Sequence, residues 1–251
     1  MQLTRSCLPI LALVAAMSAH GQTKSLSLDS ASGLTLHNAV AAPVTFEGKK
    51  AIKVTISPQA ADADGASGRW QERGQKKGGG PGAGEANRMD HLGIVDGVEF
   101  ANGTIELDLA GEPGSGAAGG ARGFVGIAFR VQPDRKTYDA FYLRPTNGRS
   151  DDQERRNHSA QYISHPAYPW FKLRQETPSK YETYVDIQPA KWIHVKVVVD
   201  GEKARLYVNG SDQPALVVND VKSGAGGKGA VALWFEGSTI AHYANLRIES
   251  K

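Results

Sequence analysis

The densest group of side chains that can do chemistry lies between Arg149 and Pro166. Guanidinium groups make paired hydrogen bonds to carboxylates and sugar hydroxyls, and imidazole carries protons near neutral pH. The residues of this stretch that can take such roles are Arg149, Asp151, Asp152, Arg155, Arg156, His158, Gln161 and His165. Two interpretations stay open: part of a saccharide site, or a solvated loop whose charges pair with one another.

Two strand-like runs precede this stretch. Side chains alternate between the two faces of a strand, and one face of each run is bulky and apolar, which suits a core. The opposite face has small residues in the middle and aromatic or cationic residues towards its ends: Phe124, Gly126, Ala128 and Arg130, then Tyr138, Ala140, Tyr142 and Arg144. This pattern predicts a hollow that binds a polar, ring-shaped ligand. The alternative is the ordinary solvated face of a sandwich.

A run near the C-terminus repeats the pattern, with Ala230, Ala232, Trp234 and Glu236 on the face opposite its apolar residues. Strand parity therefore predicts that Arg130, Tyr142, Arg144 and Trp234 share one concave surface. The full set of predicted ligand contacts is Arg130, Tyr138, Tyr142, Arg144, Gln161, Trp234 and Glu236.

Three classes of function fit these residues. The one we favour is recognition of a glycan or oligosaccharide on the concave face. The second is a saccharide-cleaving enzyme, for which an acid and a base must reach one bond. A glycoside hydrolase would use Glu236 with Asp151 or Asp152, and a polysaccharide lyase would use His158 or His165 with Tyr142 and an arginine. The third is an adhesion module without a small ligand.

The sequence gives little indication of a metal or cofactor. Asp151 and Asp152 offer oxygen ligands to a structural calcium ion, but no loop of spaced Asp or Asn ligands surrounds them. His158 and His165 lack a third zinc ligand at a recognisable spacing. Cys7 is the only cysteine, and it precedes the expected mature chain. We therefore expect no cofactor, with structural calcium as the open alternative.

Residues 1–21 have the pattern of a secretory signal peptide. Arg5 is followed by the apolar run 7–19, which is shorter than the roughly 20 residues that span a bilayer. Small residues then predict cleavage before Gln22 and a secreted or periplasmic protein. No later apolar run approaches membrane length, and the formal charge of +3 does not indicate a nucleic-acid partner. The oligomeric state stays open.

Residues 22–251 are expected to form one all-β domain. Short alternating runs separated by Gly, Asn and Asp turns predict a sandwich or barrel, and the clearest hairpin is 191–209, with a turn at Asp200-Gly201. Residues 58–88 are rich in Gly, Pro and charge, and we expect a mobile insertion there. No segment longer than a turn or two shows helical periodicity.

The strand order resembles the concanavalin A-like lectin/glucanase superfamily, with its laminin G-like jelly rolls. The similar segments are NGTIELDLAG, GFVGIAFRV, TYDAFYLRP, KWIHVKVVVDGEKARLYVNG, GAVALWFEG and AHYANLRI. The chain also looks like the 3-keto-disaccharide hydrolase domain of secreted bacterial proteins. The resemblance implies a concanavalin A-like jelly-roll β-sandwich, a fold that hosts lectins, hydrolases, lyases and adhesion modules. The E-x-D-x-E strand of the retaining glucanases is absent.

Overall fold

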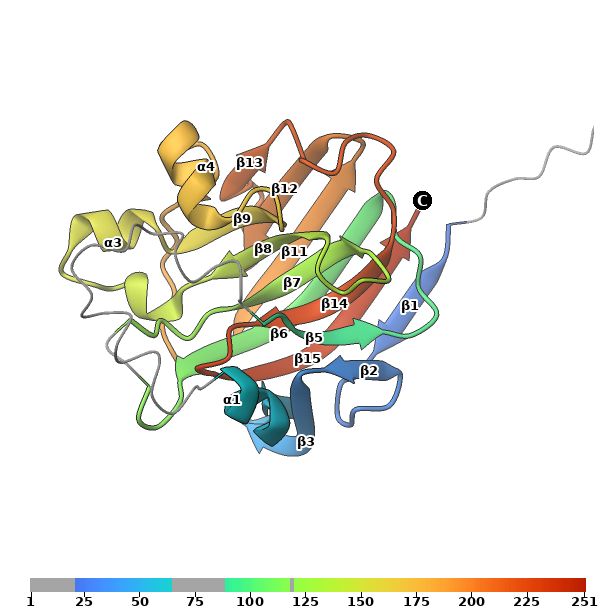
Figure 1. The fold of residues 1–251 in the computed structure, drawn as a ribbon, viewed down its shortest axis with the longest axis vertical. Helices are drawn as coiled ribbons and strands as arrows, with labels where there is room; N and C mark the ends of the chain where they lie inside the picture. The colour runs from blue at the N-terminus through green and yellow to red at the C-terminus, as the bar shows by residue number, and fades with distance from the viewer. Residues whose placement is uncertain (1–20, 65–88, 118–119) are drawn as a thin grey trace, which may run out of the picture.

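Two antiparallel β-sheets lie face to face in the computed structural model, which describes residues 21–64, 89–117 and 120–251 (Figure 1). The strands of sheet A, in spatial order, are β13 (Leu216–Val218), β12 (Lys203–Val208), β11 (Ile193–Asp200), β6 (Gly103–Pro113), β15 (Thr239–Ser250), β4 (Lys49–Ile56) and β3 (Ala39–Phe46), with β1 (Thr23–Leu26) also pairing with β15. Those of sheet B are β10 (Glu182–Thr183), β9 (Ala160–His165), β8 (Tyr138–Leu143), β7 (Val125–Val131), β14 (Ala230–Phe235), β5 (His91–Val95) and β2 (Leu34–His37). The predicted all-β sandwich is therefore confirmed.

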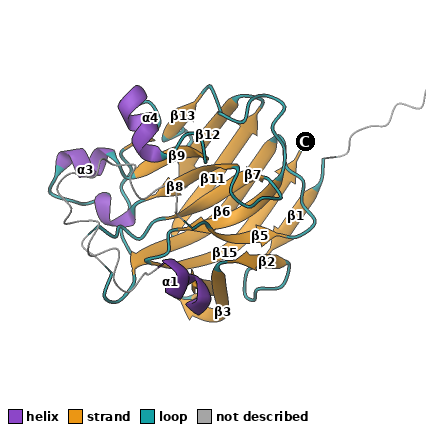
Figure 2. Ribbon diagram, in the orientation of Figure 1, coloured by secondary structure: helices purple, strands orange, loops and turns teal. Residues whose placement is uncertain are grey.

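The helical segments are short and lie outside the sheets (Figure 2). They are α1 (Pro58–Asp64), the 3-10 turn η2 (Pro145–Asn147), α3 (Gln153–Asn157) and α4 (Trp170–Glu176). Together α3 and α4 flank the β9 end of sheet B. No helix in the described ranges is both long and apolar enough to cross a membrane.

The hydrophobic core fills the space between the sheets. A Cβ placed at Gly111 of β6 would come within 2.8 Å of Val125, so the side chain of Val125 points from sheet B towards sheet A. Ile127 and Phe129 share its parity and are fully buried. From sheet A, the hydroxyl of Tyr243 crosses the core and donates to the backbone oxygen of Trp234. The bulky face of each run is thus the core face, as the alternation predicts.

Residues 58–88 only partly follow the prediction of a loop. Their first seven residues form α1, because Ser57 caps the helix: its hydroxyl accepts from the backbone nitrogen of Ala60 at 3.2 Å. Pro58 then occupies the first helical position, where a missing N–H costs nothing. Residues 65–88 lie outside the described part of the chain, as do residues 1–20 of the expected signal peptide.

Arg130 does not lie on the predicted concave surface. It has a φ of 55° and occupies an irregularity in the β7–β14 register, between the pairs Ala128–Ala232 and Val131–Ala230. The extra residue shifts its parity. Its buried guanidinium lies at one end of the sandwich, where it donates hydrogen bonds to oxygens of Ala101, Asn102, Gly201, Ser223 and Gly224.

His242 stacks on Phe46, with ring centroids 3.8 Å apart and planes 8° from parallel. It is 4% exposed, and burial, aided by the charge of Lys53, lowers its pKa from 6.5 to about 4. The folded protein therefore holds His242 neutral at pH values where the unfolded chain already binds a proton.

Replacing Arg130 with Met should lower the free energy of unfolding by at least about 3 kcal/mol, because several buried oxygens lose their donor together. The control is Arg247→Met, since Arg247 pairs with Glu249 at the exposed surface and its loss should cost under about 1 kcal/mol. Urea denaturation measures both. Equal effects of the two substitutions would contradict the role assigned to Arg130.

Acid should destabilise the fold through His242. As the pH falls from 6.5 towards 4, the unfolded chain takes up a proton that the folded chain refuses, so the free energy of unfolding falls by up to about 3 kcal/mol. His242→Phe preserves a ring against Phe46 and removes this component. Denaturation measured from pH 7.5 to pH 4 should give a flatter profile for the variant, and identical profiles would show that His242 does not contribute.

Candidate functional site

A row of chemically capable side chains crosses sheet B on its outer face, the face turned away from sheet A. The register pairs Glu182 with Gln161, Gln161 with Tyr142, Tyr142 with Gly126, and Gly126 with Trp234. Directly opposed residues in antiparallel strands project to the same face. We call this set the outer row: Glu182, Gln161, Tyr142, Gly126 and Trp234.

Gly126 stands in the middle of the outer row, and the two aromatic rings on either side of it stack against each other. The ring centroids of Tyr142 and Trp234 are 4.8 Å apart, with an angle of 28° between planes. A Cβ at position 126 would lie 2.2 Å from the backbone oxygen of Phe141 and 2.7 Å from the Cβ of Tyr142. The close approach of β7 to β8 therefore requires glycine.

The predicted hollow over the small residues is filled. Ala128 pairs with both Ala140 and Ala232, which places three alanines side by side in the next row of the outer face. The indole nitrogen of Trp234 donates to the hydroxyl of Tyr138 at 2.9 Å, and by the register this bond reaches across the alanines. Trp234 is 1% and Tyr138 2% exposed. The small residues therefore make room for rings of this protein.

Tyr138 connects Trp234 to two further groups. Its hydroxyl donates to Oδ1 of Asp90, just before β5. Its ring stacks on that of His165, the residue directly opposite it on β9, with centroids 5.3 Å apart. Sequence reasoning missed Asp90, because the pairing spans 48 positions and no local motif marks it.

Arg144 holds the other end of the aromatic pair. Its guanidinium donates to the hydroxyl of Tyr142 at 2.7 Å, to Oε1 of Gln161 at 3.1 Å and to the backbone oxygen of His158 at 2.9 Å. The same group lies 5.0 Å from the ring centroid of Tyr142 and 6.0 Å from that of Trp170 on α4. The structure thus brings together three residues that the sequence singled out: Tyr142, Arg144 and Gln161.

Glu182 organises the corner beyond Arg144. Its carboxylate accepts three hydrogen bonds from Arg174 of α4, at 2.9, 3.2 and 2.7 Å, and Nδ1 of His158 lies 2.8 Å from it. Burial lowers the pKa of His158, against the opposing effect of Glu182. Glu182 and Arg174 were not among the predicted site residues, although Glu182 faces Gln161 by register.

Two of the three proposed catalytic carboxylates, Asp152 and Glu236, have structural partners. Asp152 caps α3, accepting hydrogen bonds at Oδ1 from the backbone nitrogens of Glu154 and Arg155, and Asp151 beside it is exposed. Glu236 follows β14 and accepts from the backbone nitrogen and hydroxyl of Ser238. Within the described residues, no group of three or more His, Cys, Asp or Glu side chains is arranged to hold a metal ion.

No family model and no curated protein matches this chain. Among solved structures, the carbohydrate-binding module CBM66 of Bacillus subtilis is similar at a TM-score of 0.53 and 15% identity, covering 86% of this chain and 95% of its own. A galectin-like protein of unknown function from Bacillus subtilis follows at 0.48 and 10%, covering 92% of this chain and 96% of its own. The first likeness supports the concanavalin A-like jelly-roll fold that the sequence resemblance implied.

Gly126→Ala should destabilise the protein by at least about 1–3 kcal/mol, because its Cβ would collide with the backbone of β8. The stack of Tyr142 on Trp234 should loosen as well. Near-UV circular dichroism reports the aromatic pair and urea denaturation reports stability. The matched control is Gly226→Ala, where a Cβ would meet nothing within 4 Å. Unchanged spectra and stability in Gly126→Ala would contradict the packing described.

Proposed function

We propose that this protein binds a glycan through the outer face of sheet B. The observation that carries the proposal is the outer row together with Arg144, which sets an aromatic pair, a guanidinium, an amide and a carboxylate side by side. Aromatic rings stack on sugar rings, while guanidinium, amide and carboxylate groups pair with hydroxyls. Outer faces of antiparallel sheets are ordinarily solvated, whereas the side chains of this row are buried.

The glycan is proposed to bind at the end of the face that α4 borders. Trp234 and Tyr142 are 1% and 3% exposed, so their rings form the floor of the site. Trp170 is partly exposed, and its ring lies 4.8 Å from the guanidinium of Arg174 and 6.0 Å from that of Arg144. Trp170 and Arg174 are only partly buried, so they offer a ring face and a charged donor to a sugar, whereas Arg144 is 5% exposed and belongs to the floor of the site.

Export belongs to the same proposal. It is supported by the signal-peptide pattern of residues 1–21. A glycan outside the cytoplasm is the corresponding partner.

A glycan array probed with the purified mature protein, with and without a chelator, should identify a ligand. Trp170→Ala and Arg144→Met should each weaken the binding of that ligand about 5- to 100-fold, because each removes a stacked ring or a charged hydrogen bond. The chelator arm tests structural calcium at the same time.

The matched control is Trp192→Ala. Trp192 is also partly exposed, but it packs on Phe46 and Lys49 of sheet A, so its loss should leave binding unchanged. Binding that survives both Trp170→Ala and Arg144→Met, or a folded protein that recognises no glycan, would reject the proposal.

A further inference from the structure

The hydroxyl of Tyr138 lies in the middle of a series of hydrogen bonds, and the chemistry of the groups fixes which atom donates in each bond. An indole N–H can only donate, so the oxygen of Tyr138 accepts from Trp234 at 2.9 Å. The single proton of the hydroxyl then goes to Oδ1 of Asp90. Tyr138 thus accepts a hydrogen bond from Trp234 and donates one to Asp90.

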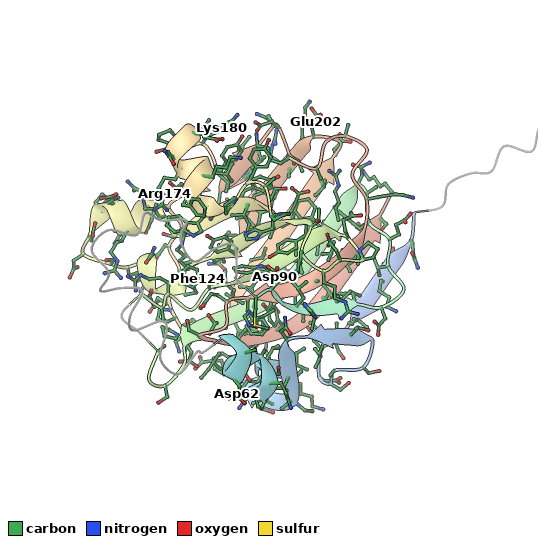
Figure 3. All side chains as sticks on the ribbon, in the orientation of Figure 1. Asp62, Asp90, Phe124, Arg174, Lys180 and Glu202 are labelled. Atoms are coloured by element: carbon green, nitrogen blue, oxygen red, sulfur yellow. The ribbon has the colours of Figure 1, made fainter. Side chains whose placement is uncertain are left out.

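Asp90 is itself held in place from the β2 edge of sheet B. The side-chain amide of Asn38, between β2 and β3, donates to the backbone oxygen of Asp90 at 2.9 Å. Asp90 lies near the centre of the view in Figure 3, over sheet B. These hydrogen bonds thus link four segments that are distant in sequence, at Asn38, Asp90, Tyr138 and Trp234.

We propose that Asp90 is a positioning residue, which acts through Tyr138 to fix the indole of Trp234 in the orientation that stacks on Tyr142. The inference rests on the proposed function, because the positioned rings are the floor of the proposed glycan site. It also gives Tyr138 a role in holding the indole, in addition to its predicted place among the ligand contacts.

Because Trp234 is buried, the loss of any of these hydrogen bonds should affect its indole. Trp234 is 1% exposed, so its N–H has little access to water, and without Tyr138 it would lose an acceptor that the site provides. The ring of Tyr138 is also fixed from its other side by the stack on His165. Loss of the carboxylate lets the hydroxyl proton of Tyr138 turn about the C–O bond, so the lone pair that accepts the indole N–H is no longer held in one direction.

The test compares Asp90→Ala, Asp90→Asn and Tyr138→Phe in protein labelled with ¹⁵N at tryptophan. The indole N–H resonance of Trp234, assigned with Trp234→Phe, should move in Asp90→Ala and in Tyr138→Phe. Affinity for the glycan found on the array should fall about tenfold in both, with little further loss in the double variant. Asp90→Asn should keep both readouts near those of the parent protein, because an amide oxygen still accepts from the hydroxyl.

The matched control is Tyr162→Phe. Tyr162 also donates to a buried carboxylate, that of Asp139 at 2.6 Å, but on the core side of sheet B. Its loss should lower the melting temperature while leaving the resonance of Trp234 and the affinity unchanged. A shift as large as that of Tyr138→Phe would mean that general loosening, and not positioning, explains the effect.

An unmoved indole resonance in Asp90→Ala would overturn the inference. So would lost binding in Asp90→Asn with the resonance in place, since Asp90 would then contact the ligand directly. If the parent protein binds no glycan, the proposed function fails, and the indole resonance still decides whether Asp90 positions Trp234.

Discussion

The outer face of sheet B depends on the missing side chain of Gly126. With β7 so close to β8, a single methyl group would meet the backbone at 2.2 Å. The rings of Tyr142 and Trp234 close over this gap, and each is then held by a polar partner, Arg144 for Tyr142 and Tyr138 for Trp234. A constraint of backbone packing thus becomes a preorganised surface, which is what a binding site requires of its supporting residues.

Each face of sheet B carries a tyrosine that donates to an aspartate, and the two pairs have different roles. On the outer face Tyr138 donates to Asp90, and on the core face Tyr162 donates to Asp139. Burial raises the pKa of Asp139 despite these donors, and the charge of Arg130 acts in the opposite direction. The core pair is fully buried, whereas the outer pair orders the proposed site.

Strand alternation predicted much of this arrangement, because a period of two needs only local sequence. It placed Tyr142, Trp234 and the core-facing residues correctly, and the resemblance to jelly rolls agreed with the sandwich. It failed at Arg130, where one residue with positive φ shifts the parity. That conformation is stabilised by hydrogen bonds from Arg130 to oxygens of residues distant in sequence, among them Ala101 and Gly224. Local sequence cannot reveal such partners.

The other errors have the same origin. Small residues in a strand predict space, but not whether a ligand or the protein's own rings fill it, and here Trp234 and Tyr138 do. Asp90 and Glu182 acquire their roles from partners brought near by the fold. Ser57 and Pro58 indicate the start of α1, but the glycine-rich composition of the residues that follow led to the prediction of a loop.

The central claim is that a glycan binds to the outer face of sheet B. Hydrogen–deuterium exchange of the intact protein, with and without the glycan selected on the array, measures this directly. The account predicts slower exchange on binding at 138–144, 160–165 and 170–183, the segments that carry Arg144, Gln161 and Trp170. Protection confined to sheet A, at 193–208 for example, with no change along β8 and β9, would contradict it.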